Sequence, residues 1–400
     1  MESTYTDTHA PETKGHLPTL IASFLHFDLS FMLWVMLGAL GIFIAQDLKL
    51  TPAEKGLMVA IPTLSGSLMR VPMGLLSDRF GGTRVGVAML AFLFLPLLLG
   101  WQFGYTLPSL VMVGLLLGTA GASFAVALPL ASRWYPAQRQ GLVMGIAAGN
   151  SGTVIANLAA PRLAELVGWH NVLALVLLAF ALLARDSPAT TTGQPLRSYL
   201  SALKISDMWW FCLLYSVTFG GYVGLGSFLP TFFHDQYGLD AINAGYLTAL
   251  AAFTGSALRP VGGWLSDKVG GVRMLTVLLL GIALTYGLGA QLPPPGVMTA
   301  LLVFGMACFG MGNGAVFQLV PQRFQKQIGV ATGVIGAVGG LGGFFLPNLL
   351  GIVKQNSGSF SDGFLVLSGV ALAALVMLRV LVAIQQGWRL AWRAPQVAEL

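Results

Sequence analysis

Long apolar runs separated by short polar segments dominate the sequence. A helix needs about 20 apolar residues to cross a hydrocarbon core of about 30 Å, and such runs recur from position 20 to the 380s. The pattern predicts a polytopic membrane protein with twelve transmembrane helices. The sixth is expected to begin near Leu163, because the apolar run 172–184 alone is too short to span a bilayer before Arg185. The expected starts are Leu20, Gly56, Val85, Leu107, Gly141, Leu163, Trp209, Ala241, Met274, Gly296, Gly329 and Phe360.

The chain divides into two halves that repeat each other. The longest polar connection, 185–207, separates two sets of six predicted spans. Residues 66–84 align without gaps on residues 255–273, at a constant offset and with ten identical positions. A parallel repeat is the layout of transporters that hold substrate near the midplane, between their halves. The predicted organisation is a cytoplasmic tail at 1–19, a six-helix bundle at 20–184, a cytoplasmic linker at 185–207, a six-helix bundle at 208–387 and a cytoplasmic tail at 388–400.

Composition and charge agree with a membrane location and exclude a soluble fold. Of the 400 residues, 56% are hydrophobic and 9% are charged, against about 25% charged in soluble domains. The net charge of +6 indicates topology, not nucleic acid binding. With the N-terminus inside, fourteen Lys and Arg residues lie in cytoplasmic segments and four in outer ones. We therefore expect a multi-pass protein of a bacterial cytoplasmic membrane, with both termini cytoplasmic.

The residues give little support to an enzyme or a sensor. A membrane redox enzyme would need haem or metal ligands, yet the five histidines form no facing pair on a predicted span. Cys212 and Cys308 lie within predicted spans without CxxC spacing, and we expect them to pack as small apolar residues. A non-transporting sensor would need a signalling domain, which the sequence does not contain. We expect no enzymatic activity, no cofactor and no metal.

Several motifs resemble those of one transporter superfamily. The segment GLLSDRFGGTR, with Gly74, Asp78, Arg79, Gly81 and Arg84, is similar to the helix 2 to helix 3 motif of the major facilitator superfamily, and residues 263–273, with Asp267, form a second copy. Nearly the whole chain resembles the nitrate/nitrite porter family, most clearly in 121–152, 209–230 and 310–343. The resemblance implies an all-α major facilitator fold of two pseudo-symmetric six-helix bundles. It also implies a transporter of nitrate and nitrite that works as a monomer in membrane lipid.

Two arginines are the strongest candidates for anion binding. Arg70 precedes Asp78 by eight residues, which at about 1.5 Å per residue places it about 12 Å into the membrane. Arg259 stands at the equivalent position of the second repeat. A central arginine costs at least about 2.5 kcal/mol, so a pair needs a compensating role. The forked guanidinium suits a small planar oxyanion. The alternative is pairing with a buried carboxylate, but Asp28 cannot neutralise both; the resemblance also implies that both bind nitrate.

Further candidates for the binding site follow from the resemblance. Tyr215, Phe219 and Tyr222 share one side of a predicted helix, a spacing that usually indicates packing. In the family, positions that match Phe124, Tyr215 and Phe219 wall the nitrate site, and we expect Tyr222 to lie behind them. Asn150 matches a family residue that donates to the anion, although an asparagine here could also bridge helices.

Glycine recurs at near-helical spacing in the fifth and eleventh predicted spans. Such stripes allow close helix packing, and they also suit faces that slide as the two halves rock. The resemblance implies that they pack against the arginine helices. The glycines are Gly141, Gly145, Gly149 and Gly152 in one span, and Gly329, Gly333, Gly336, Gly339, Gly340 and Gly343 in the other. We assign conformational roles to Gly145, Gly149, Gly152, Gly333, Gly336 and Gly339, and to Asp78, Arg79, Arg84 and Asp267.

Asp28, two residues after His26 in the first span, is the candidate for proton coupling. An ionisable residue within a span is a functional candidate by default. The alternatives are a static partner of Arg70 or a helix-end residue near the inner surface. Coupling is needed because an inside-negative potential opposes anion entry by about 2.3 kcal/mol per charge per 100 mV. Proton symport is favoured; electroneutral exchange of nitrate for nitrite, or transport of another small anion, is the alternative.

Overall fold

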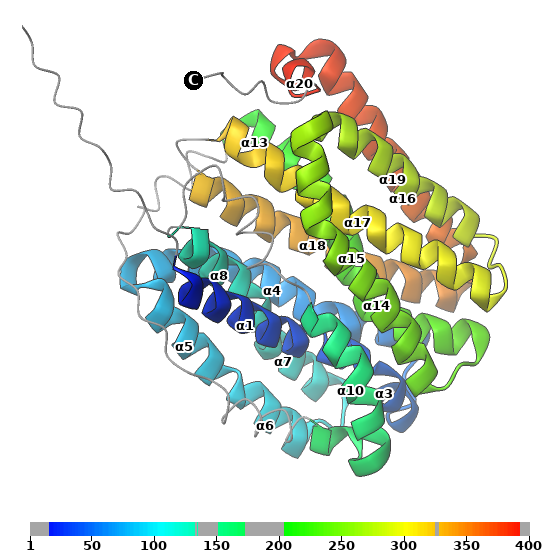
Figure 1. Cartoon of the computed structure of the whole chain (residues 1–400). Helices are drawn as coiled ribbons and strands as arrows, with labels where there is room; N and C mark the ends of the chain where they lie inside the picture. Colours follow the sequence, from blue (N-terminus) through cyan, green and yellow to red (C-terminus); the bar gives the residue numbers. More distant parts are fainter. Residues whose placement is uncertain (1–15, 133, 135–150, 173–203, 325–327, 393–400) are drawn as a thin grey trace, which may run out of the picture.

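The computed structural model describes residues 16–132, 134, 151–172, 204–324 and 328–392. Within these ranges the chain is helical and contains no strand. The helices lie side by side in two groups, blue to teal for the first half and green to red for the second (Figure 1).

The described helices of the first half account for the first four expected spans and for part of the fifth. Among those four, only the second is a single uninterrupted helix. The elements are α1 (Leu17–Trp34), α2 (Met36–Ala39), α3 (Gly41–Asp47), α4 (Pro52–Phe80), α5 (Gly82–Phe92), α6 (Phe94–Phe103), α7 (Leu107–Leu117), the 3₁₀ segment η1 (Gly118–Ala122), α8 (Ser123–Ser132) and α10 (Ser151–Val167).

The second half contains the longest described helix, α18, with 30 residues. Its first span carries a π-helical segment, η3, between two α-helices. The elements are α13 (Ser206–Tyr215), η3 (Ser216–Gly220), α14 (Gly221–Tyr237), α15 (Ala241–Val269), α16 (Gly271–Gly289), α17 (Pro295–Arg323), α18 (Ile328–Ser357), α19 (Ser361–Ile384) and α20 (Gln386–Leu390).

Ten helices in the described ranges are long and apolar enough to cross a membrane. The other two expected spans, from Gly141 and from Leu163, are described only in part, because 135–150 and 173–203 lie outside those ranges. The expected start of the sixth span at Leu163 is wrong. Leu163 lies within α10, which runs to Val167, and Gly168 with φ of 80° separates α10 from a helical turn that begins at Trp169. The apolar residues of 163–167 therefore extend the fifth span.

The internal repeat is visible in the backbone. Helices α4 and α15 each have 29 residues, and their first residues are separated by the offset found in the sequence repeat. Each ends at a glycine with positive φ, 99° at Gly81 and 96° at Gly270, a conformation that side chains with a Cβ rarely adopt. Thr51 and Asp240 cap the two N-termini by accepting hydrogen bonds from backbone N–H groups. The repeat therefore sets the same helix length and the same turn in both halves.

Helices α4 and α18 form the main seam between the halves. Glycine lets their backbones approach closely: a Cβ on Gly56 would lie 2.5 Å from the Pro347 carbonyl oxygen, and one on Gly343 would lie 2.9 Å from the Thr63 side chain. The same seam continues to Gly340, which faces Ser67. Small residues at such contacts are typical of helix packing in lipid. The seam leads from one end of α4 to Arg70.

Candidate anion-binding site

Arg70 projects from α4 into the interior of the protein and is completely buried. Its Nε donates to the Gly121 carbonyl at 3.0 Å, and its Nη1 donates to the Gly336 carbonyl. Gly121 belongs to the first half and Gly336 to the second, so this side chain joins the two halves. Its Nη2 is buried without a hydrogen-bond partner in the described part of the chain. A buried guanidinium N–H without an acceptor costs free energy, and Nη2 therefore remains able to donate to an additional acceptor.

Aromatic rings surround the Arg70 guanidinium. Its central carbon lies 4.7 Å from the ring centre of Phe124, 5.0 Å from that of Phe219 and 5.5 Å from that of Trp34. These distances are within the range of cation–π attraction, which is strongest where water is absent. The rings therefore hold the cation in an apolar environment without neutralising it.

Arg259 occupies the equivalent position on α15 and is 4% exposed. Its Nη2 donates to the Tyr215 hydroxyl at 3.5 Å, and its guanidinium lies 5.9 Å from the Phe317 ring. Tyr215 and Phe219 stack with ring centres 4.9 Å apart and an interplanar angle of 4°. The two arginines are thus connected through one pair of stacked rings.

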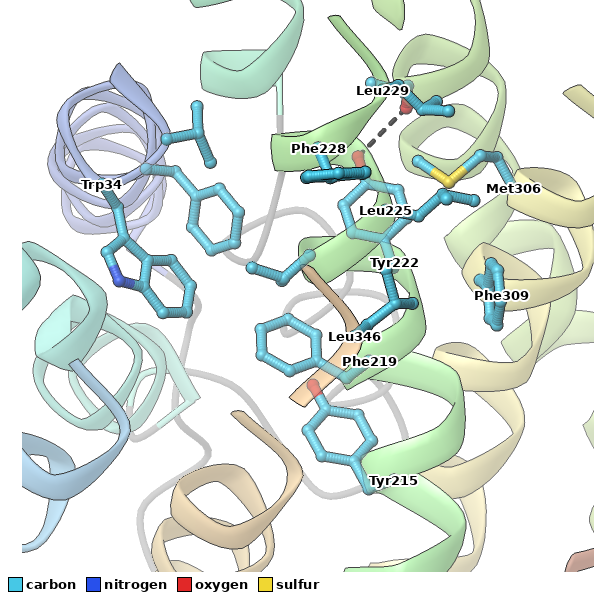
Figure 2. Close-up of a cluster of buried hydrophobic side chains, with 14 of the residues drawn as sticks. Trp34, Tyr215, Phe219, Tyr222, Leu225, Phe228, Leu229, Met306, Phe309 and Leu346 are labelled. Carbon is cyan, nitrogen blue, oxygen red and sulfur yellow. Dashed lines mark hydrogen bonds between the residues drawn. The ribbon is translucent and has the colours of Figure 1, made fainter. Parts of the chain in front are cut away.

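We call Phe124, Tyr215, Phe219 and Phe317 the aromatic wall. Phe317 lies 5.7 Å from Phe124 and 5.0 Å from Tyr215 between ring centres, and the four residues come from α8, α13, η3 and α17. Figure 2 shows Tyr215 and Phe219 along one helix and Trp34 on the blue helix across from them. The structure therefore brings together the predicted Phe124, Tyr215 and Phe219 with both arginines.

The sequence pattern alone does not single out Phe317 or Trp34. Phe317 lies within 310–343, one of the stretches that carry the family resemblance, and this position is the one sequence signal that points to it. Trp34 is held by a hydrogen bond from its Nε1 to the Pro62 carbonyl, 2.7 Å long, and its ring packs against Gly66 and Gly121. An aromatic residue in the first span has many packing explanations, and nothing in the sequence pairs it with Arg70.

The aromatic wall depends on the π-helical segment η3. This segment contains Phe219 and follows directly on Tyr215. Gly220 packs against the backbone of Gly342 and Gly343 in α18, where a Cβ would come within 2.7 to 2.8 Å. A π segment widens a helix locally and is frequent at functional sites. The wider turn and the glycine contact together set the position of the stacked rings.

The glycines of α18 lie directly against Arg70 and the aromatic wall. A Cβ on Gly336 would lie 2.8 Å from Phe124 and 3.4 Å from Arg70 Nη1, and one on Gly339 would overlap the Tyr215 ring. Gly333 is half-buried on the same helix. In α10, Gly152 packs against the backbone of Asp28. Three predicted residues lie outside the described ranges: Gly145, Gly149 and Asn150.

Asp28 and His26 contact neighbouring helices of the first half. The Asp28 carboxylate accepts hydrogen bonds from the Ser151 hydroxyl and from the Gly152 N–H, the latter 3.2 Å long. His26 Nε2 lies 3.2 Å from the Gly86 carbonyl and its Nδ1 lies 2.7 Å from the Ser123 hydroxyl. Because a carbonyl only accepts, Nε2 carries the proton. Neither residue is hydrogen-bonded to Arg70, which bonds to backbone carbonyls.

Comparisons with known proteins identify the family. The family model of the Major Facilitator Superfamily matches residues 20–347. The "Nitrite extrusion protein" of Bacillus subtilis is 36% identical over 356 residues, which cover 87% of this chain and 90% of that protein. The chain belongs to the nitrate/nitrite porter family of the Major Facilitator Superfamily. A further relative of this porter is the "Probable nitrate/nitrite transporter NarK2" of Mycobacterium tuberculosis. It is 34% identical over an alignment that covers 90% of this chain and 95% of that protein.

The fold of the porter is shared with a solved transporter. A bacterial homologue of the human lysosomal transporter Spinster, in an inward-facing and occupied conformation, matches with a TM-score of 0.64 at 20% identity. The match covers 94% of this chain and 96% of the other. The predicted all-α major facilitator fold is confirmed, and so is the prediction that the chain is not an enzyme, because its family consists of transporters.

The loop motif of the porter lies at the ends of α4 and α15. Arg79 and Arg84 are exposed on either side of the Gly81 turn, and the Arg79 guanidinium lies 5.3 Å from the Phe80 ring. Asp78 belongs to the last turn of α4, and Asp267 is exposed in the last turn of α15. These residues lie away from the aromatic wall, so any conformational role would act through the helix ends.

Proposed function

We propose that this porter carries nitrate, and also nitrite, across the cytoplasmic membrane by alternating access. The observation that carries the proposal is Arg70, a fully buried cation with an unpaired Nη2, beside a second buried arginine across the aromatic wall. Two positive charges in a bilayer are costly unless an anion accompanies them. The names of the relatives support nitrate and nitrite as that anion.

The chemistry of the site suits a small planar oxyanion. A guanidinium can donate two parallel hydrogen bonds to two oxygens of one anion, a geometry that an ammonium cannot reproduce. The rings of the aromatic wall limit the space beside both arginines, and its three phenylalanines offer no hydrogen-bond acceptor. The Tyr215 hydroxyl is the acceptor that the wall presents to Arg259. Nitrate and nitrite are flat and carry a single charge, so they match both the donors and the narrow space.

Alternating access is supported by the way Arg70 joins the halves. Its Nη1 bonds to Gly336 in α18 while its Nε bonds to Gly121 in η1. An anion between the two arginines would screen their repulsion and allow the halves to approach, whereas an empty site would favour their separation. The porter works as a monomer in membrane lipid, with both termini on the cytoplasmic side, as the distribution of Lys and Arg favours.

We further propose that uptake is coupled to protons through Asp28. Anion entry against an inside-negative potential requires another gradient. Asp28 is 7% exposed and bonds to α10, whose first residue directly follows Asn150 in the sequence. A change in its charge would therefore alter the contact between α1 and α10. His26 links α1 to α5 and α8 and is the second candidate for proton coupling.

Reconstitution into liposomes tests substrate and coupling together. We expect nitrate to accumulate inside when the outer solution is acidic, and a protonophore to abolish the accumulation. Absence of nitrate flux under every imposed gradient would overturn the proposed substrate. Flux that requires nitrite on the opposite side and ignores the pH gradient would replace symport by nitrate/nitrite antiport. Antiport remains the second candidate because the Bacillus subtilis relative is named for nitrite extrusion.

A further inference from the structure

Tyr222 forms a hydrogen-bonded contact between α14 and α15 that the proposed anion site does not use. The side chain is 1% exposed. Its hydroxyl donates to the Ala252 carbonyl at 3.0 Å and lies 2.7 Å from the Ser256 hydroxyl. Because the single phenolic proton goes to the carbonyl, the Ser256 hydroxyl must donate to Tyr222. Figure 2 shows the Tyr222 hydroxyl, with one hydrogen bond from it drawn as a dashed line.

The contact lies next to Arg259 on the same helix. Ser256 precedes Arg259 by three residues, so the two side chains share one face of α15. Tyr215, which accepts the bond from Arg259, precedes Tyr222 by seven residues, or about two helical turns. Two tyrosine hydroxyls from one transmembrane span therefore contact α15, one at Arg259 and one a turn away.

The backbone of α15 around Arg259 is also packed closely against α14 and α17. The Tyr222 ring fits against Gly255, where a Cβ would lie 2.6 Å from the ring. Gly310 and Gly314 of α17 pack against the carbonyls of Gly255 and Arg259. This turn of α15 therefore has no room to move toward α17, and the Tyr222 ring packs equally closely against it.

We propose that the hydrogen bond between Tyr222 and Ser256 is a positioning device that sets the orientation of Arg259 for the anion. The proposal rests on the proposed function, in which Arg259 binds nitrate. Tyr222 acts through Arg259 and does not touch the anion. Such a residue changes affinity, because a bidentate bond needs its donors in place before the anion arrives. It changes turnover little, since the ring keeps its packing.

The test compares Tyr222→Phe with Tyr286→Phe. Both tyrosines are buried, but the Tyr286 hydroxyl has no hydrogen-bond partner in the described ranges and belongs to α16, away from the aromatic wall. We expect Tyr222→Phe to raise the Kd and the KM for nitrate about three- to tenfold, the effect of one buried hydrogen bond. The kcat should stay unchanged, and the thermal midpoint should fall by only a few degrees, because one buried hydrogen bond contributes about 1 kcal/mol to stability. Tyr286→Phe should leave all four quantities unchanged.

Substitutions at Ser256 separate positioning from packing. Ser256→Ala should raise the Kd as Tyr222→Phe does, the double variant should be no worse than either single one, and Ser256→Thr, which keeps the hydroxyl, should restore affinity. Normal affinity in Tyr222→Phe, or losses that add in the double variant, would overturn the inference and leave the proposed function intact. Wild-type protein that binds no nitrate, or normal binding by Arg259→Lys, would overturn the proposed function and this inference with it.

Discussion

Lys55 and Asp235 form an ion pair that joins the two halves of the porter at one end of the bundle. The Lys55 ammonium lies 2.9 and 2.8 Å from the two carboxylate oxygens, and the side chains are 17% and 13% exposed. Lys55 belongs to the first turn of α4 and Asp235 to the end of α14. Near them Gln46 contacts His234 at 3.4 Å. The halves are therefore closed at this end, which the predicted topology places outside.

Neutralising Lys55 should open that end more often. A partly exposed ion pair contributes about 1 kcal/mol, so Lys55→Gln should shift the balance between the open and closed states about fivefold. A cysteine at Thr63, which lies in the seam between α4 and α18, would report the opening to a membrane-impermeant maleimide. The two native cysteines, Cys212 and Cys308, are buried and should contribute little labelling.

The matched control restores the pair with its charges reversed. Lys55→Asp combined with Asp235→Lys should bring the labelling rate of Thr63→Cys back toward that of the parent, whereas each single reversal should raise it. Equal labelling in the parent and in Lys55→Gln would show that the ion pair does not hold this end closed.

The two arginines should not tolerate lysine. Arg70→Lys or Arg259→Lys keeps the charge but loses one hydrogen bond of the fork, which for a charged group costs about 1.5 to 3 kcal/mol. Nitrate affinity should therefore fall more than about tenfold. Arg162→Lys is the control, because Arg162 lies 4.7 Å from the Tyr246 ring, away from the aromatic wall. Uptake and binding are compared at matched protein levels, and near-normal values for both variants would remove the arginines from the site.

Much of the fold could be predicted because lipid imposes strong rules. Ten of the expected spans begin close to the start of a described helix, and the sequence repeat recurs in the equal lengths of α4 and α15. The failure at Leu163 has a physical cause. A hydropathy pattern measures only the length of an apolar run. The turn there depends on the positive φ of Gly168, which does not affect hydropathy. Breaks in the first span and the π segment at 216–220 escape a hydrophobic pattern for the same reason.

The site was only partly predictable, because side-chain meeting points depend on tertiary packing. The cost of a central cation and the internal repeat were sufficient to select Arg70 and Arg259. Phe317 could not be chosen from spacing, since its contacts with Phe124 and Tyr215 join three different helices. The Lys55–Asp235 pair was missed likewise, because the two residues are 180 positions apart.

Gly336 should not accept a large side chain. A Cβ there already lies 2.8 Å from Phe124, and overpacking of this kind costs about 1 to 3 kcal/mol. Gly336→Leu should abolish nitrate turnover while the protein still inserts into the membrane. Gly369→Leu in α19 is the control, because nothing lies within 4 Å of its Cβ. The test compares nitrate turnover of the two variants in liposomes at equal protein content. Normal rates in Gly336→Leu would exclude a tight interface at this glycine.

Asp28→Asn separates proton coupling from anion recognition. The asparagine keeps one oxygen to accept from Ser151 or Gly152, but it cannot be charged. If Asp28 takes up the transported proton, the variant should lose nitrate accumulation driven by a pH gradient. It should retain exchange of internal for external nitrate, because that reaction needs no net proton movement. Liposomes loaded with nitrate measure both activities in one preparation.

A purely structural role for Asp28 predicts a different result. Its carboxylate accepts two hydrogen bonds from α10, so a static contact would weaken in the asparagine variant and lower exchange and accumulation together, along with the thermal midpoint. Asp28→Glu keeps a titratable carboxyl group and should recover part of the pH-driven accumulation only if protonation matters. Full pH-driven accumulation in a stable Asp28→Asn protein would exclude Asp28 as the proton carrier. Exchange of nitrate for nitrite, which needs no titratable group, would then become the favoured mechanism.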